Sequence, residues 1–406
     1  MACICAVAAL VACDPTTGDI QTVDVTVTVD ASEIDAAVAP ETYNVTLTNT
    51  ANGNVVTAET ENGVAVANVI PGIYTIVVEA TVADGGFTYF LTGSAKDTNI
   101  LESENAVTVK MGIVKESQLV IKETYYTGCT YNTSETEQAT YFRDQFHEIY
   151  NNSNEVAYAD SLCIAFTLFA NYKYEVFYTY NIPNAENYVY TQHIWQIGGD
   201  GDDYPIQPGE SIIIAQWATN HKADILTKNG SPVDLSGAEF EAIEGEKELW
   251  NATITDGPAI NMAFAVDAKG FGLQQWMVPT GGANLIIFKP STPLRTSDFL
   301  ISNEDASIMA TAHEVAFEDI LDAVQSIDDE TRVSTLGMPE ILDKGYIWCS
   351  GTYVGESIAR KQAGTLENGA PKYQDTNNTT NDFEVQKTPM IRRNNAGVPS
   401  WNTWNK

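Results

Sequence analysis

VDVTVTV, residues 23–29, alternates apolar and polar side chains at every position. Because successive side chains of a β-strand point to opposite faces, this period of two predicts a strand with one buried face. The same alternation recurs in YNVTLT at 43–48, and IYTIVVEA at 73–80 is rich in the β-branched and aromatic residues of strands. In the turn IPG at 70–72, proline presets φ and glycine accepts a positive φ. We therefore predict a compact β-sandwich over residues 21–118.

The length and the net charge of the chain limit the number of domains and the kinds of partner that we expect. It has 406 residues, which is too long for one ordinary domain and predicts two. Its 54 acidic side chains outnumber 21 basic ones, so the formal net charge is -33. A charge of this sign repels phosphate backbones, and we therefore expect no nucleic-acid partner. We interpret the acidity as a solvated surface that indicates no specific ligand.

A second domain is predicted after the composition changes. Aromatic residues and asparagine become more frequent beyond Glu123. We predict a second β-sandwich over residues 119–393, with a long β-rich insertion at about 219–312 and a C-terminal tail at 394–406. The predicted fold class is therefore all-β, with two immunoglobulin-like β-sandwich domains in tandem.

The N-terminal residues have the features of a lipoprotein signal peptide. An apolar run at 2–12 is far shorter than the roughly 20 residues that cross a bilayer as a helix. It ends in Leu-Val-Ala-Cys, whose last residue, Cys13, would carry a diacylglycerol lipid and become the mature N-terminus. Residues 1–13 are thus predicted as a signal peptide and 14–20 as a tether. Because no basic segment precedes the apolar run, we expect the natural start codon to lie upstream of Met1.

Three cysteines follow the predicted lipidation site: Cys129, Cys163 and Cys349. An odd number of cysteines cannot pair completely within one chain. Cys163 lies in an apolar run and is interpreted as a small buried hydrophobe. The sequence leaves open whether Cys129 forms a disulfide with one of the other two.

Motifs that indicate catalysis are missing from the sequence. It contains no Gly-x-Ser-x-Gly, no His-Glu-x-x-His and no Walker loop. Its four histidines show no pair at metal-ligand spacing, and they are His147, His193, His221 and His313. We therefore predict that the protein is not an enzyme and has no cofactor besides the lipid on Cys13. A glycan-cleaving enzyme with two carboxylates that meet only in space is the least favoured hypothesis.

Tryptophan side chains are the leading candidates for ligand contact, because an indole face stacks on sugar rings or fills a partner's pocket. Four lie in or near the predicted insertion, and these are Trp195, Trp217, Trp250 and Trp276. In a β-sandwich a tryptophan more often fills the core, which is the competing interpretation of each. Trp401 and Trp404 lie in a tail that has no periodicity to bury both.

An acidic loop, GGDGDD at 198–203, offers three carboxylates to a hard cation such as calcium. They belong to Asp200, Asp202 and Asp203. The loop lacks the EF-hand spacing and its distant bidentate glutamate. A solvated hairpin turn is therefore the favoured interpretation, and calcium is only a weak candidate.

Parts of the chain resemble known β-sandwich modules. NVIPGIYTIVV at 68–78 resembles the end of prealbumin-like and carboxypeptidase-regulatory-like modules, which have seven-stranded sandwich folds. LVIKETYY at 119–126, IQPGESIII at 206–214 and SIARK at 357–361 resemble parts of a lamin-tail-like sandwich. This resemblance implies a spacer or presentation domain followed by a lamin-tail-like domain.

A wider resemblance concerns the whole second domain. YNNS at 150–153 and DTNNTTNDF at 375–383 resemble an uncharacterised surface-lipoprotein family of gut Bacteroidetes, built on a domain of unknown function. Similar lipoproteins commonly sit on TonB-dependent outer-membrane transporters and help to capture nutrients. The resemblance implies lipid anchoring in the outer membrane facing the cell exterior, with such a transporter and an extracellular ligand as partners.

Two functions from different classes remain. The first is a non-catalytic surface lipoprotein that serves as a ligand-binding accessory of a TonB-dependent transporter. The second is a cell-surface adhesin or structural scaffold in which both sandwiches present a sticky face. A neighbouring gene for a TonB-dependent barrel would favour the first, and fimbrial or repeat-bearing neighbours would favour the second.

Overall fold

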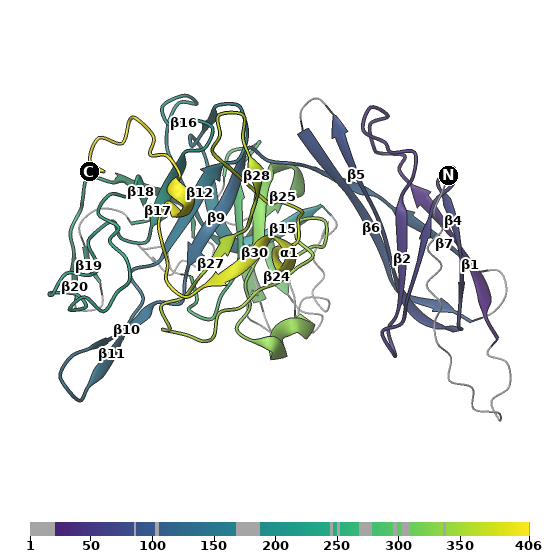
Figure 1. Ribbon diagram of the computed structural model, residues 1–406, viewed down its shortest axis with the longest axis horizontal. Helices are drawn as coiled ribbons and strands as arrows, with labels where there is room; N and C mark the ends of the chain where they lie inside the picture. The colour runs from purple at the N-terminus through teal and green to yellow at the C-terminus, as the bar shows by residue number, and fades with distance from the viewer. Residues whose placement is uncertain are drawn as a thin grey trace. The chain divides into compact units, whose positions relative to one another are not determined.

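The computed structural model describes residues 21–84, 87–101, 105–167, 187–243, 247–249, 252–267, 278–294, 299–302, 309–335 and 338–405. The chain divides into two compact units, Met1–Ile113 and Val114–Lys406. The predicted all-β class is confirmed, since only short helical turns such as α1 (Thr379–Asp382) interrupt the strands (Figure 1). Within these described ranges no helix is long and apolar enough to cross a membrane. The predicted signal peptide and tether lie outside the described residues.

The first unit is a sandwich of two sheets. One sheet has the order β4–β1–β7, in which β7 is parallel and β4 antiparallel to β1. The other has the order β3–β2–β5–β6–β8. These eight strands exceed by one the seven that the resemblance implied. They are β1 (Val23–Asp30), β2 (Asn44–Asn49), β3 (Val55–Glu59), β4 (Val64–Val69), β5 (Gly72–Asp84), β6 (Phe87–Ile100), β7 (Asn105–Lys110) and β8 (Gly112–Lys115).

The period of two in the sequence determines which side chains lie between these sheets. In β1, Val25 and Val27 are fully buried, whereas Asp24 and Thr28 face solvent. Burial of each such branched side chain contributes roughly 1.5–3 kcal/mol. The other fully buried members of this core include Val45, Leu47, Ile76 and Val78.

The second unit contains two larger sheets (Figure 1). The first has the order β21–β18–β17–β12–β9–β27–β30. These strands are β21 (Ile260–Asn261), β18 (Phe240–Glu241), β17 (Ser211–Ala215), β12 (Phe146–Asn151), β9 (Leu119–Tyr125), β27 (Ser357–Arg360) and β30 (Phe383–Gln386). The second has the order β24–β25–β15–β14–β23–β26, and β22 also pairs with β15. These are β24 (Phe299–Ser302), β25 (Met309–Ala316), β15 (Tyr188–Gln196), β14 (Cys163–Thr167), β23 (Asn284–Phe288), β26 (Ile320–Gln325) and β22 (Ala263–Asp267).

Four two-stranded ribbons complete the second unit. They are β10 (Cys129–Asn132) with β11 (Gln138–Tyr141), β13 (Ala157–Tyr158) with β16 (Pro205–Ile206), β19 (Lys247–Leu249) with β20 (Ala252–Ile254), and β28 (Gln362–Thr365) with β29 (Pro371–Tyr373). The main core combines apolar side chains of both large sheets, among them Ile121, Ile149 and Ile214 from the first and Ile164, Leu285 and Ile287 from the second. Burial of these side chains holds the two sheets face to face.

The stretch predicted as an insertion is part of this sandwich. Within 219–312, β18 and β21 extend the first sheet, and β23 lies between β14 and β26 in the second. β23 is fully buried, with the sequence NLIIF. A buried strand without alternation gives no sign in the sequence of the sheet it joins, so the sequence alone did not place β23 between β14 and β26.

A β-bulge places charged residues side by side on the outer face of the first sheet. Glu148 of β12 pairs with Glu123, but Ile149 pairs with Ile121, so Lys122 is the extra residue of β9. Lys122 Nζ lies 2.8 Å from Glu148 Oε1, and both side chains are buried. Burial lowers the pKa of Lys122, and the neighbouring Glu148 carboxylate opposes that shift.

The C-terminal strap, residues 387–405, covers this charged face. Arg393 Nε lies 3.0 Å from Glu123 Oε2, and Arg392 Nη2 lies 2.5 Å from Glu239 Oε1. The backbone N–H of Arg392 donates to Glu148 Oε2 at 3.0 Å. Burial raises the pKa of both Glu123 and Glu239, and each arginine opposes that shift. The segment predicted as a tail at 394–406 is therefore an integral part of the sandwich.

Arg360 links the two sheets at an edge of the core. Its Nε donates to the Ile121 carbonyl at 3.0 Å, and its Nη2 donates to Asp322 Oδ2 at 2.5 Å. Asp322 also accepts from the backbone N–H of Ile121 at 2.6 Å. Asp375 and Asp382 lie 3.1 and 3.6 Å from the guanidinium Nη1. One buried cation thus ties β27, β26 and the 375–382 segment together.

Replacement of Arg393 by alanine should destabilise the second unit. Loss of the guanidinium leaves the Glu123 carboxylate buried without its cation, which costs about 3 kcal/mol of unfolding free energy. Urea denaturation followed by tryptophan fluorescence measures this loss. Lys372→Ala is the matched control, because the Lys372 side chain in the second unit is 44% exposed and its pair with Glu116 should be worth less than about 1 kcal/mol. Equal losses in both variants would contradict the account.

Candidate ligand-binding site

Two of the four predicted ligand-binding tryptophans lie in the described part of the chain, and both are buried. Trp195 is 1% exposed and stacks on Phe264, with ring centroids 4.9 Å apart. Trp217 is 4% exposed, and its Nε1 donates to the Thr255 carbonyl. Neither ring has a free face, so the structure corrects the prediction that these two can stack on a ligand. Trp250 and Trp276 lie outside the described residues.

The two tail tryptophans anchor the C-terminal strap. Trp401 Nε1 donates to the Pro205 carbonyl and Trp404 Nε1 to the Ala238 carbonyl, each at 2.9 Å. Both rings are half-buried, and their centroids lie 6.3 Å apart. Their indoles therefore fasten the strap to the sandwich.

The acidic loop is organised by a different carboxylate. Asp160 accepts hydrogen bonds from the backbone N–H groups of Gly201, Asp203 and Tyr204 at 3.0–3.1 Å. Asp200, Asp202 and Asp203 are exposed, and Asp203 Oδ2 accepts from the backbone N–H of Asp200. In the described part of the chain no three His, Cys, Asp or Glu side chains are grouped to hold a metal. Asp160 therefore holds the loop as a turn, and the calcium candidate stays a prediction.

The histidines and cysteines do not come together. Burial lowers the pKa of His147 to about 3 and that of His221 to about 4, so both are neutral. His193 stacks on Phe264, and His313 lies on β25. Cys129, Cys163 and Cys349 are free and buried, so the disulfide left open by the sequence is not formed. Burial raises the pKa of each thiol.

A buried cluster around Asp144 has polar groups of the types found in catalytic sites. Ser231 Oγ and Tyr125 Oη donate to Asp144 Oδ2 at 2.7 and 3.0 Å. His221 instead contacts Tyr141 Oη and the Trp217 carbonyl. Through its hydrogen bonds Asp144 joins Ser231 to Tyr125 of β9. We therefore interpret the cluster as structural.

Aromatic side chains that the sequence analysis did not single out lie in the segment 346–354, here called the aromatic segment. The rings of Tyr346 and Trp348 are within 13° of parallel, with centroids 6.0 Å apart. Both are half-buried, while Ile347 between them packs against the main core. Residues i and i+2 of extended chain share a face, so the two rings point outward together. Val354 adds an apolar side chain that is 42% exposed.

The backbone beneath the ring pair is fixed on both sides. Ile347 N–H donates to the Gln325 carbonyl at 3.0 Å, and Ile327 N–H donates to the Ile347 carbonyl at 2.9 Å. On the other side, Tyr346 N–H donates to Thr380 Oγ1 at 3.0 Å, and that hydroxyl donates to the Tyr346 carbonyl at 2.9 Å. A rigid frame of this kind lowers the entropy lost when the rings contact a ligand.

The neighbouring segment 375–382 is rich in hydroxyl and amide groups. Asp343 holds it in place by accepting from the backbone N–H of Thr379 at 2.7 Å and from that of Gly345 at 2.9 Å. Thr376, Thr380 and Asn381 are exposed. Asn377 Nδ2 is buried and has no hydrogen-bond partner. Uncharged donors and acceptors therefore lie next to the ring pair.

Tyr353 has an unusual backbone conformation within the aromatic segment. Its φ is 58°, in the left-handed region that bulky residues rarely adopt. Hydrogen bonds from Tyr353 N–H to the Thr127 carbonyl and from Gly355 N–H to the Gly128 carbonyl hold this turn. Strain of this kind is concentrated at binding and catalytic sites.

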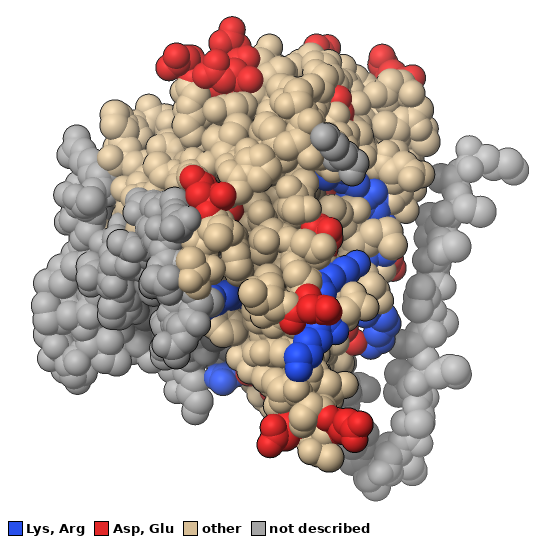
Figure 2. All heavy atoms as spheres, turned by 90° about the vertical axis from the view of Figure 1, so that its left-hand side faces the viewer, with Lys and Arg blue, Asp and Glu red and all other residues tan. Residues whose placement is uncertain are grey.

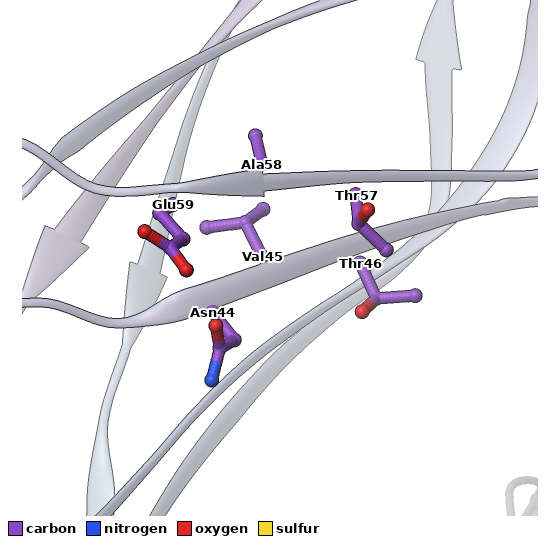
Figure 3. Close-up of a pocket in the computed structure, with 6 residues that line it drawn as sticks. All are labelled: Asn44, Val45, Thr46, Thr57, Ala58 and Glu59. Carbon is purple, nitrogen blue, oxygen red and sulfur yellow. The ribbon is translucent and has the colours of Figure 1, made fainter. Parts of the chain in front are cut away.

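A depression of about 520 Å³ lies on the first unit (Figure 3). Asn44 and Thr46 of β2 stand directly opposite Glu59 and Thr57 of β3. The depression is open and polar, and no aromatic side chain lines it. It therefore lacks the enclosed apolar walls that are typical of small-molecule sites.

Charged side chains do not form one continuous patch on the face in view in Figure 2. Acidic residues stand there in separate groups among uncharged ones, and a few basic residues lie between them (Figure 2). Arrangements of this kind favour solubility over the capture of one charged partner.

Comparisons with known proteins find similarity to a family of unknown function. Residues 207–390 match the family model "Protein of unknown function (DUF4876)". The match includes the aromatic segment and covers a little under half of the chain. A crystal structure of a DUF4876 family protein from Bacteroides thetaiotaomicron is 29% identical, covers 94% of this chain and 99% of its own, and has a TM-score of 0.63. The coarser part of the resemblance drawn from the sequence, a Bacteroides family with a domain of unknown function, is thereby supported.

Other comparisons add little. A "putative adhesin" from Bacteroides ovatus is 9% identical over 76% of this chain and 88% of its own, with a TM-score of 0.20. A score this low carries no argument about fold or function. No curated protein matches the chain.

The Asp144 cluster predicts a pH dependence of stability. Burial raises the pKa of Asp144 to about 6, above the value of about 3.9 for an unfolded aspartate. The folded state therefore binds the proton more tightly, and the stabilisation present below about pH 4 is lost as the pH rises through 6. Asp144→Asn should remove up to about 3 kcal/mol of this dependence. Urea denaturation of both proteins between pH 4 and 7 measures it, and parallel curves would contradict the assignment.

Proposed function

We propose that this protein is a non-catalytic surface lipoprotein that binds an extracellular saccharide through the aromatic segment. One observation carries the proposal: the half-buried rings of Tyr346 and Trp348 lie nearly parallel on a backbone that hydrogen bonds fix on both sides. Sugar rings present apolar C–H faces to which an indole or phenol ring is complementary. Their hydroxyl groups suit the amides and hydroxyls of the 375–382 segment, which Thr380 joins to Tyr346.

Three buried glutamates of the first sheet have structural and not catalytic partners. Glu148 pairs with Lys122 of β9. Glu123 and Glu239 pair with Arg393 and Arg392 of the strap. Groups engaged in this way are not poised to exchange protons with a substrate. The proposal therefore includes no reaction and no cofactor besides the lipid.

The same proposal places the protein in the outer membrane, lipid-anchored at Cys13 and facing the cell exterior, where it serves as an accessory of a TonB-dependent transporter. A saccharide held at the cell surface is the cargo that such a partner would import. The apolar run that ends at Cys13 supports the anchor.

Replacement of Trp348 by alanine should weaken saccharide binding at least tenfold, since loss of a central aromatic contact typically costs about 2 kcal/mol or more. Affinity electrophoresis of the purified full chain against a panel of soluble polysaccharides measures the change. Trp348→Phe keeps a ring face and should retain most of the affinity. Tyr131→Ala, which removes a half-buried ring from the β10–β11 hairpin, should leave binding unchanged.

Two results would contradict the proposal. The first is a wild-type protein that migrates unretarded in every polysaccharide of the panel. The second is a Trp348→Ala variant that folds, by its unfolding midpoint, and binds as tightly as the wild type.

Replacement of Cys13 by serine should remove the lipid and release the protein from the membrane, because the thiol is the only acyl acceptor that the proposal assigns. Expression of both tagged forms in a Bacteroides host, followed by cell fractionation and intact-mass measurement, tests this. A wild-type protein that fractionates with the soluble proteins and carries no added lipid mass would exclude the anchor.

A further inference from the structure

Lys344 lies two residues before Tyr346, in the same run of extended chain. The backbone N–H groups of Lys344 and Tyr346 both donate to the 375–382 segment. Backbone groups of Gly345 and Ile347 bond instead to β26, on the opposite side. Hydrogen bonds that alternate between two sides are the pattern of an extended chain, in which residues i and i+2 share a face. The Lys344 side chain therefore shares its face with the ring pair.

The ammonium group of Lys344 is partly withdrawn from water. The residue is half-buried, and burial lowers the pKa of its side chain. Water and salt screen a charge less when it is partly buried, so such a cation gains more from an anion than a fully hydrated one does. An anionic group that a ligand brings to this face would therefore stabilise the charged lysine.

Three carboxylates that border this face are turned inward. Asp343 and Asp382 are each 1% exposed, and both accept hydrogen bonds from backbone N–H groups of the 375–382 segment. Asp375 binds the buried guanidinium of Arg360. These acids fix the shape of the segment and do not face a ligand at its surface.

A second lysine lies beside Thr380, the residue whose hydroxyl holds the backbone of Tyr346. Lys361 Nζ lies 2.7 Å from the Asn381 carbonyl oxygen and 3.4 Å from that of Thr380. The formal net charge of the whole chain is -33, which repels anions in general. An anionic ligand is therefore held only where cations lie close together, as they do around the 375–382 segment.

We propose that the saccharide bound at the ring pair is acidic and that Lys344 binds its carboxylate or sulfate group. This inference rests on the proposed saccharide binding and adds the class of the ligand. Alternate residues of an extended chain lie about 7 Å apart, a separation that one sugar with an acidic substituent spans. The rings contact the apolar face of the sugar, and the lysine Nζ donates charge-assisted hydrogen bonds to the acidic group.

Affinity electrophoresis of the full chain against matched pairs of polysaccharides tests the inference. One pair is polygalacturonate and its methyl ester, and the other is dextran sulfate and dextran, so the acidic group alone differs within each pair. The wild type should bind the acidic member of at least one pair at least tenfold more tightly than the neutral member. The first pair reports on a carboxylate and the second on a sulfate.

Replacement of Lys344 by glutamine should lower the affinity for that acidic polysaccharide at least tenfold, whereas Lys344→Arg keeps the charge and should retain most of it. Lys361→Gln should cause a smaller loss, because Lys361 Nζ is already bonded to two carbonyls. Lys222→Gln is the matched control, since it removes an exposed lysine from another loop, changes the net charge equally and should leave binding unchanged. The unfolding midpoint of each variant reports whether it folds.

Binding by the wild type that is equal within both pairs, or confined to neutral polysaccharides, would overturn this inference and leave the proposed function intact. Equal affinity of Lys344→Gln and Lys222→Gln for the acidic polysaccharide would overturn it as well. A wild type that no polysaccharide retards would contradict the proposed function itself, and this inference with it.

Discussion

The second unit depends on neutralising three glutamates that its own sheet buries. Glu123 of β9, Glu148 of β12 and Glu239, just before β18, lie on the outer face of the first sheet, where isolated carboxylates would be strongly disfavoured. Lys122 supplies one cation from within the sheet, and Arg392 and Arg393 supply two from near the end of the chain. Because a buried charge without its partner is costly, the sheet and the strap are stable only together.

Buried ion pairs also connect the two sheets to the proposed binding site. Arg360 gathers Asp322, Asp375 and Asp382, so the start of the 375–382 segment is fixed to both sheets. Asp343 holds the middle of that segment, and Thr380 in turn holds the backbone of Tyr346. Hydrogen bonds and ion pairs that run from Arg360 through the 375–382 segment thus fix the backbone that carries the two rings.

Much of the fold could be predicted from the sequence, but little of the site. Strict alternation in 23–29 and 43–48 correctly indicated the core side of each strand, because a half-buried strand shows its face in its own pattern. β23, buried on both faces, gave no such signal and was assigned to an insertion. Burial of Trp195 and Trp217 depends on strands distant in sequence, so composition alone could not separate them from Trp348. The spacing of Tyr346, Ile347 and Trp348 was the available signal, since an apolar residue between two aromatic ones indicates an extended edge with outward rings.

Fluorine NMR of the full chain labelled with 5-fluorotryptophan tests the central claim most directly, because each of the seven tryptophans gives its own resonance. Substitution of single tryptophans by phenylalanine assigns the signals. On titration with a saccharide that binds, the account predicts that the Trp348 resonance shifts first and furthest, while those of the buried Trp195 and Trp217 stay in place. A Trp348 signal that does not move while the Trp250 or Trp276 signal shifts would contradict the account and place ligand contact elsewhere.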